Sequence, residues 1–258
     1  TIDNIELIAY KLLQGKVWEG KIKPHDFDPD TKFSSGSVIE KFLRNVCEKD
    51  EIWFTSLCTH LGYLLHRYKP GHLSVMVAFL DRNIRNFWEA NGGTGKSLIV
   101  KCLMFLRDVE RFDAKSDLSY VFSFDTVTAW TDIIFLEDLR KEISLERFFV
   151  GITEGTSIKR KYQQQLVLSD DDRPGYVATS NHVLRMPPGS SSERRLREVE
   201  IGHTYNDKFT PFDEFGHEFF RQWTSEEFNR FFHFMLSCLA LYFKHSIIPA
   251  PNINTEHR

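Results

Sequence analysis

The sequence has 258 residues, with 33 Lys and Arg against 36 Asp and Glu, which gives a formal net charge of −3. This balance excludes a generally basic nucleic-acid binder, so any contact with nucleic acid has to come from local positive patches or from many copies of one patch around a ring. No apolar stretch approaches the ~20 residues that span a bilayer, so we expect no membrane-spanning segment. The hydrophobic fraction of 41%, with 23 Phe, predicts a globular protein with a substantial core.

The first four residues, Thr1 to Asn4, have neither the basic start nor the apolar stretch of a signal peptide. The four cysteines are widely spaced and form no Cys-x-x-Cys pair, which favours free thiols over disulfides or a zinc site. We therefore expect a cytoplasmic protein. The missing initiator Met indicates a fragment or a processed chain.

Residues 1–72 predict a helical N-terminal subdomain. Apolar residues between Ile5 and Leu13 recur at the spacing of one helix face, and Ser37 with Glu40 forms a capping-box pattern ahead of a second helix. A third helix is expected over residues 52–68, and an apolar run at 73–80 predicts a strand.

A phosphate-binding loop is the most informative feature, and its residues are Ala90-Asn91-Gly92-Gly93-Thr94-Gly95-Lys96-Ser97. The usual pattern is a glycine, four free positions and then Gly-Lys-Ser/Thr, so only the first glycine is replaced, by Ala90. The glycines allow backbone N–H groups to surround an anion, Lys96 can reach a phosphate, and Ser97 offers a hydroxyl to Mg²⁺. A glycine-rich turn that binds nothing is the alternative. The following buried helix, which would present its N-terminus to phosphate, favours nucleotide binding.

A second informative segment is the apolar strand at residues 133–136, which ends in Glu137 and Asp138. An uninterrupted apolar strand is typical of a parallel sheet, where chemistry is placed at the carboxyl ends of strands. ATP hydrolysis needs one acid at the Mg²⁺ shell and another to orient or deprotonate water. We expect Glu137 and Asp138 to fill these roles, with Ser97 and Glu137 as metal ligands; a strand end exposed to solvent is the alternative.

A hairpin is predicted with arms at residues 157–161 and 165–168. Lys159, Lys161 and Tyr162 near its tip could grip a nucleic-acid backbone and stack on a base. An exposed basic edge that discourages aggregation explains the same residues, and their types alone do not decide between the two.

Two further segments carry candidate residues. The strand expected at residues 176–180 is followed by Asn181, whose amide can hold a water molecule or a phosphate. A Pro/Gly/Ser turn then presents Arg194 and Arg195, which could be supplied to a phosphate on a neighbouring subunit or could form a solvated basic patch. From residue 206 on, an aromatic helical stripe predicts core or subunit contact.

Taken in order, these pieces resemble a superfamily III helicase of the AAA+ type. More narrowly, they resemble the helicase half of primase–helicases from phages and integrative elements. The resemblance spans about residues 73–243 and includes Ile152-Thr153-Glu154-Gly155, Ser192-Glu193-Arg194-Arg195 and Pro211-Phe212-Asp213-Glu214-Phe215-Gly216. A Glu-Asp pair in place of Asp-Asp is a departure that keeps both charges.

The resemblance implies a P-loop AAA+ core at residues 73–205, with a central, mainly parallel sheet flanked by helices and a C-terminal helical segment at 206–258. It implies ATP and Mg²⁺ as cofactors, a homo-oligomeric ring that is usually a hexamer, and hairpins that line a pore for single-stranded DNA. Asn181 would be the polar sensor, and Arg194 or Arg195 the arginine finger.

The leading functional hypothesis is an ATP-dependent DNA helicase or translocase in the replication of a phage or mobile element. The first alternative is an AAA+ ATPase of the initiator or packaging type, which remodels or loads on DNA without unwinding it. An inactive nucleotide-binding scaffold and a small-molecule kinase are the other two alternatives. The acids and the paired arginines argue against the scaffold, and the lack of an evident acceptor pocket argues against the kinase.

Overall fold

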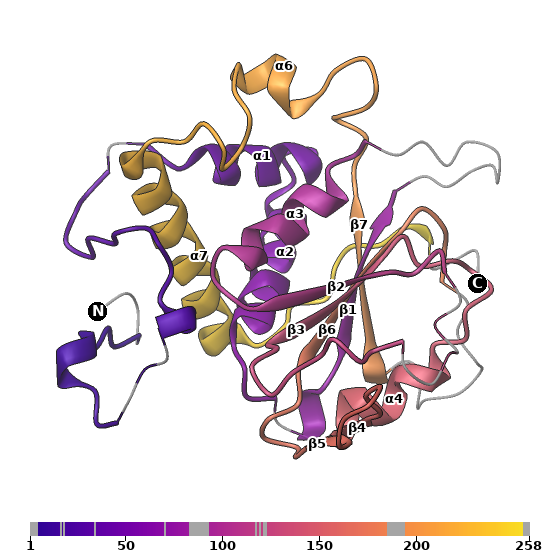
Figure 1. Ribbon diagram of the computed structural model, residues 1–258. Helices are drawn as coiled ribbons and strands as arrows, with labels where there is room; N and C mark the ends of the chain where they lie inside the picture. Colours follow the sequence, from indigo (N-terminus) through magenta and orange to yellow (C-terminus); the bar gives the residue numbers. More distant parts are fainter. Residues whose placement is uncertain are drawn as a thin grey trace.

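The computed structural model describes residues 5–254, apart from residues 16, 18, 34, 70, 83–92, 117, 119, 121–122 and 185–193. Its centre is a five-stranded, all-parallel sheet in the order β2-β3-β6-β1-β7 (Figure 1). The strands are β1 (Met76–Asp81), β2 (Val109–Asp113), β3 (Ile133–Glu137), β6 (Gly175–Ser180) and β7 (Leu196–Ile201). The predicted α/β class with a parallel sheet flanked by helices is confirmed.

Both faces of this sheet are buried, as expected for parallel strands. Alternate residues of β1 illustrate the division: Val77 and Phe79 pack into one core, whereas Ala78 and Leu80 pack into the other. The first core contains α1 (Val38–Val46), α2 (Glu51–Leu65), α3 (Lys96–Met104) and α7 (Ser225–His245). The second contains α4 (Glu146–Thr153) and the hairpin of β4 (Thr156–Ile158) and β5 (Leu166–Leu168).

Capping side chains mark where several helices begin, including the one predicted after Ser37. Ser37 Oγ accepts a hydrogen bond from the Glu40 amide at 3.1 Å, and Thr224 Oγ1 accepts one from the Glu227 amide at 3.2 Å. A short helix, α6 (Pro211–Phe215), begins with a complete capping box. None of the helices in the described ranges is long and apolar enough to span a bilayer.

Helices α2 and α7 pack closely at Gly62. A Cβ atom built on this glycine would lie 2.2 Å from the carbonyl oxygen of Cys238, so the two backbones approach too closely for any side chain. This packing joins the N-terminal helices to the C-terminal one, across most of the sequence.

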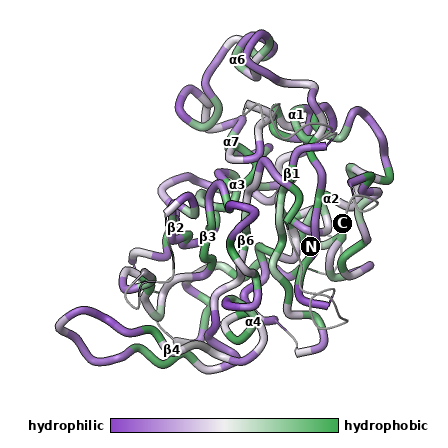
Figure 2. Tube along the Cα trace, turned by 90° about the vertical axis from the view of Figure 1, so that its right-hand side faces the viewer, coloured by the Kyte–Doolittle hydropathy of each residue, from purple (hydrophilic) through white to green (hydrophobic). Residues whose placement is uncertain are grey.

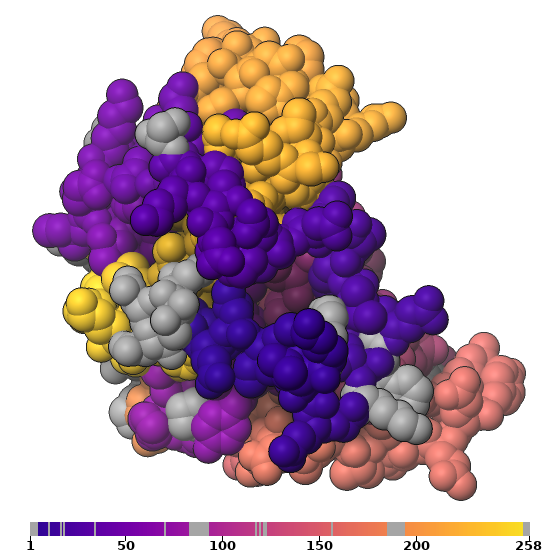
Figure 3. Space-filling view, turned by 90° about the vertical axis from the view of Figure 1, so that its left-hand side faces the viewer, coloured from indigo at the N-terminus to yellow at the C-terminus, as the bar shows by residue number. Residues whose placement is uncertain are grey.

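The prediction of a helix near the N-terminus is wrong. Only a 3₁₀ turn at Tyr10–Leu12 forms there, and Leu12 is 68% exposed. Short isolated helices are marginal in water, and this apolar stripe has no core to pack against. The segment instead lies as an extended strap across one face of the protein (indigo in Figure 3).

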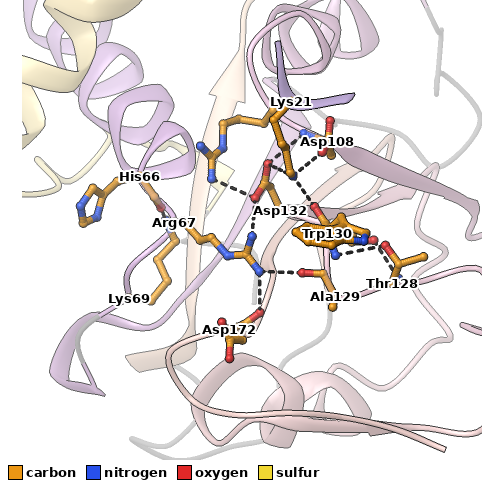
Figure 4. A network of polar contacts seen from close by, with 12 residues as sticks. Lys21, His66, Arg67, Lys69, Asp108, Thr128, Ala129, Trp130, Asp132 and Asp172 are labelled. Carbon is orange, nitrogen blue, oxygen red and sulfur yellow. Dashed lines mark hydrogen bonds and ion pairs between the residues drawn. The ribbon is translucent and has the colours of Figure 1, made fainter. Parts of the chain in front are cut away.

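A cluster of ion pairs fastens this strap. Lys21 pairs with Asp108 and with the buried Asp132, to which Arg67 also donates at 3.1 Å (Figure 4). Lys23 pairs with Asp108 at 3.0 Å. Asp132 directly precedes β3, so the strap is held at the amino end of the sheet.

The apolar run at residues 120–124 also predicts a strand from its sequence. No strand forms in its described part, where Tyr120 is in a bend and Ser123 and Phe124 are in a turn; residues 121–122 are outside the described residues. The sheet edge is formed instead by β2, with the sequence Val-Glu-Arg-Phe-Asp and no fully buried residue. Polar residues are typical of an edge strand, because only one side of it is paired.

Candidate nucleotide-binding site

The phosphate loop leads directly into α3 at the carboxyl end of β1. Gly93 and Gly95 have φ of +95° and +97°, which favour glycine, and Gly95 is the N-cap of α3. The ring of Phe42 in α1 lies beneath the loop, because a Cβ on Gly95 would be 2.6 Å from the Phe42 Cζ atom. Asn91 and Gly92, also predicted to bind nucleotide, lie outside the described residues.

Lys96 is the first residue of α3, and its side chain is buried at 6% exposure. Its ammonium group forms an ion pair with Asp81, the last residue of β1, and donates to Thr94 Oγ1 at 3.2 Å. Burial lowers the pKa of Lys96, while the Asp81 carboxylate opposes this shift. The loop lysine therefore points into the protein, toward the end of the sheet.

Ser97 and Glu137 meet, although forty positions separate them. Ser97 Oγ donates to Glu137 Oε1 at 3.2 Å, and Glu137 Oε2 pairs with Arg111 of β2. The two proposed metal ligands thus come together, one from the first turn of α3 and one from the end of β3.

Asp138 adopts a left-handed backbone conformation, with φ of +53°, immediately after β3. Its amide donates to Thr179 Oγ1 of β6 at 3.1 Å, and its carboxylate pairs with Lys115 at 2.7 Å. This hydrogen-bonded carboxylate raises the pKa of Lys115. Asp138 and Glu137 line an open hollow of about 490 Å³, together with Arg111, Asp113 and Lys115.

Asn181 directly follows β6 and is half-buried. Because β6 lies between β1 and β3, Asn181 is placed at the same end of the sheet as Lys96 and Glu137. The phosphate loop, the acid pair and the Asn181 amide thus all lie at one end of the sheet. This is expected for polar groups that follow parallel strands.

Arg194 and Arg195 are at the opposite end. They directly precede β7, whose first residue, Leu196, pairs with Met76 at the beginning of β1. The length of the six-residue strands separates them from Lys96 by about 20 Å. Arg195 lies over the ring of Phe149 in α4, at 5.3 Å from its centroid. The structure does not bring these arginines to the site of their own chain.

The predicted hairpin is present at this amino end of the sheet, with shorter strands than expected. Its tip projects from the body and is hydrophilic (Figure 2). Tyr162 is 94% exposed, with φ of +60°, and the Lys161 ammonium lies 5.3 Å from its ring centroid. Lys159 is also exposed. Arg160, in contrast, turns back and donates to the Val127 carbonyl at 2.6 Å.

The donor set fits a magnesium–nucleotide ligand. Mg²⁺ prefers oxygen ligands and is usually bound by one or two carboxylates together with substrate phosphates, and Ser97 and Glu137 supply a hydroxyl and a carboxylate. The described residues contain no group of three or more His, Cys, Asp or Glu side chains arranged to hold a metal by themselves. A metal here would therefore depend on oxygen atoms of the nucleotide.

Sequence reasoning missed three residues of the site: Asp81, Arg111 and Lys115. Asp81 ends a buried apolar strand, which is the same signal that identified Glu137. Arg111 and Lys115 had no comparable signal, because β2 itself was not recognised.

The sequence matches no protein-family model and no curated protein. Among solved structures, the apo form of the NrS-1 C-terminal region aligns with a TM-score of 0.52 at 16% identity, over 83% of this chain and 49% of that one. JCV helicase aligns with a TM-score of 0.42 at 11% identity, over 80% of this chain and 55% of that one. The chain thus spans about half the length of the structures it matches. The first likeness shows a shared fold; the second is too distant to carry an argument.

Proposed function

We propose that this chain is an ATP-dependent DNA helicase or translocase motor for the replication of a phage or mobile genetic element. The observation that carries the proposal is the hydrogen bond between Ser97 and Glu137, at 3.2 Å. It joins a phosphate-loop hydroxyl to a strand-end acid, which is the pair that a P-loop nucleotide hydrolase needs beside its Mg²⁺.

Each predicted residue has a role in this proposal. Residues 91–97 hold the phosphates, with backbone N–H groups from the loop and the ammonium of Lys96. Ser97 and Glu137 hold Mg²⁺, which would neutralise charge on the phosphate oxygens. Asp138 and Asn181 orient the attacking water from the ends of β3 and β6.

The position of Arg194 and Arg195 supports an arrangement in which one subunit completes the site of the next. Both arginines are about one strand length from their own Lys96, which favours action on a neighbouring subunit's site over action on their own. A homo-oligomeric ring, such as a hexamer, would supply that neighbour at every site. The exposed tip with Lys159, Lys161 and Tyr162 would then contact single-stranded DNA in the centre of the ring.

ATP hydrolysis with and without single-stranded DNA tests the proposal. We expect turnover that DNA stimulates and that Lys96→Ala abolishes. Lys101→Ala is the matched control, because Lys101 is an exposed lysine on the same helix. Turnover that is indifferent to DNA would contradict the motor function. DNA-stimulated turnover without strand displacement on a forked substrate would favour the remodelling or loading ATPase.

A further inference from the structure

Asp81 is a buried carboxylate beneath the phosphate loop. Its side chain is 3% exposed. Oδ1 accepts a hydrogen bond from Thr94 Oγ1 at 2.7 Å and also pairs with Lys96, whereas Oδ2 is buried and has no hydrogen-bond partner among the described residues. An isolated buried carboxylate is unfavourable, so Asp81 depends on the Lys96 ammonium for compensation.

The ion pair fixes where Lys96 points in the structure. With 6% of its side chain exposed, the ammonium group lies inside the protein and not in the space above the loop. Two of its three donors are directed at Asp81 and Thr94. A phosphate bound by the loop has to compete with this carboxylate for the same cation.

The backbone of Asp81 is held from several sides, so Lys96 is the partner that moves. Asn254 Nδ2 donates to the Asp81 carbonyl at 3.0 Å, and the next residue, Arg82, donates its amide to Ile201 at 2.9 Å. Glu200 in turn accepts the Asn254 amide at 2.7 Å. Lys96, in contrast, has a flexible four-carbon stem.

We infer that Asp81 is a latch that holds Lys96 in a retracted position and lowers the affinity of the loop for nucleotide. Binding exchanges the carboxylate for a phosphate as the partner of Lys96. Asp81 is thus a positioning residue that acts through Lys96 and sets how readily the site fills. This inference rests on the proposed function, because it requires that the loop binds a nucleotide.

The fluorescent nucleotide mant-ADP provides the test, since its binding is measured without turnover. We expect Asp81→Asn to tighten mant-ADP binding on the order of tenfold, the equivalent of one charge-assisted hydrogen bond. In a Lys96→Ala background the same substitution should give a much smaller gain, because the latch acts through that lysine. Unchanged or weaker binding by Asp81→Asn would overturn the inference and assign the carboxylate to preorganising the loop.

Asp132→Asn is the matched control, because Asp132 is also buried and is paired with cations at the opposite end of the sheet. It should lower stability and leave mant-ADP affinity unchanged. A latch also predicts that Asp81→Asn lowers the melting temperature of the empty protein more than that of the ADP-saturated protein. A purely structural role would lower both equally.

Two outcomes separate this inference from the proposed function. If wild type binds no mant-ADP, or if Lys96→Ala binds as tightly as wild type, the nucleotide site itself fails. If wild type binds through Lys96 and Asp81→Asn gives no gain, only the latch fails. Should the variant fold only with ADP present, the release rate of mant-ADP decides: slower release than wild type supports the latch, and equal or faster release overturns it.

Discussion

At the scale of single residues, three carboxylates of the candidate site each form an ion pair with a cation of the same chain. Asp81 pairs with Lys96, Glu137 with Arg111, and Asp138 with Lys115. Only the first pair is buried, and exposed pairs contribute little to stability. A magnesium–nucleotide ligand would have to exchange partners with these ion pairs.

Gly95→Ala tests whether the contact with Phe42 constrains the phosphate loop. The new Cβ would be 2.6 Å from Phe42 Cζ, and alanine disfavours the φ of +97°. We expect a loss of about 1–3 kcal/mol in the free energy of unfolding, measured with urea, together with weaker nucleotide binding.

Gly71→Ala is the control for this substitution, because its Cβ would meet nothing within 4 Å. An equal loss of stability in both variants would show that the Phe42 contact does not constrain the loop.

His60 predicts a dependence of stability on pH. It is fully buried in α2, its Nδ1 lies 2.8 Å from the Ser56 carbonyl oxygen, and burial lowers its pKa from 6.5 to about 4. Between pH 6.5 and 4 the His60 imidazole binds a proton in the unfolded chain but not in the folded one. The contribution of His60 to the free energy of unfolding is therefore fully present above pH 6.5. It decreases by about 3 kcal/mol as the pH falls toward 4.

Urea unfolding across this pH range measures the effect, with His60→Gln compared with wild type. The variant should lose less stability on acidification, whereas His245→Gln, at an exposed position, should follow wild type. Parallel curves for wild type and His60→Gln would contradict the assignment.

At the scale of elements, the strands that carry the site were predictable from the sequence, and the edge strand β2 was not. β3 and β6 are apolar runs ended by polar residues, so local pattern was sufficient. β2 has the polar pattern of an edge and was missed. The stripe near the N-terminus has helical spacing, yet it lies in an extended strap, because its apolar residues have no core to pack against and the strap is held farther along the chain by the ion pairs of Lys21 with Asp108 and Asp132. Local sequence contains no information on such partners.

The same limit applies to the site. Gly93, Gly95, Lys96 and Ser97 belong to one contiguous motif and were recognised together. Asp81, in contrast, becomes part of the site only through its contact with Lys96 across the end of the sheet.

Substitutions at the tip of the β4–β5 hairpin should affect the binding of single-stranded DNA but not the stability of the protein. Lys161→Ala with Tyr162→Ala should weaken binding of single-stranded DNA by roughly tenfold or more, since stacking on an aromatic ring contributes about 1–3 kcal/mol per base. Stability should change by less than about 0.5 kcal/mol, because both side chains are exposed.

Fluorescence anisotropy of a labelled oligonucleotide measures this affinity. Gln163→Ala with Gln164→Ala is the control, since it alters two exposed neighbours at the same tip without removing a cation or a ring. Undiminished DNA binding by the Lys161 and Tyr162 variant would leave the hairpin as an exposed basic edge.

At the scale of the whole molecule, the predicted functional residues divide between the two ends of one sheet. Lys96, Ser97 and Glu137 are at the carboxyl end, and the arginines are at the amino end. The hairpin of β4 and β5 is also at the amino end (Figure 1). Helices α1, α2 and α7 share one core with the sheet, and the division of the chain at residues 72 and 205 remains a prediction.

Mixing two inactive variants tests whether Arg194 and Arg195 act on a neighbour. The Lys96→Ala variant lacks the lysine of the phosphate loop but keeps both arginines. The variant with Arg194→Ala and Arg195→Ala lacks both arginines but keeps the loop. An equal mixture should recover about one quarter of wild-type hydrolysis, because random neighbours join an intact loop to an intact arginine at about one contact in four. Arg221→Ala, at an 80% exposed side chain, should remain active by itself.

A mixture as inactive as its two components would place the arginines in their own subunit's site or outside the reaction.

The separation of arginines and loop by the length of the sheet has a consequence for stoichiometry. A twofold dimer can also join each copy's arginine end to the other copy's loop end, because in such an interface residue i contacts residue j and j contacts i. The ring of the proposed function would make the same contact head-to-tail. An open head-to-tail chain of subunits always leaves one loop without an arginine, whereas a closed ring leaves none. Hydrolysis per subunit should therefore rise with protein concentration and stop rising once rings close.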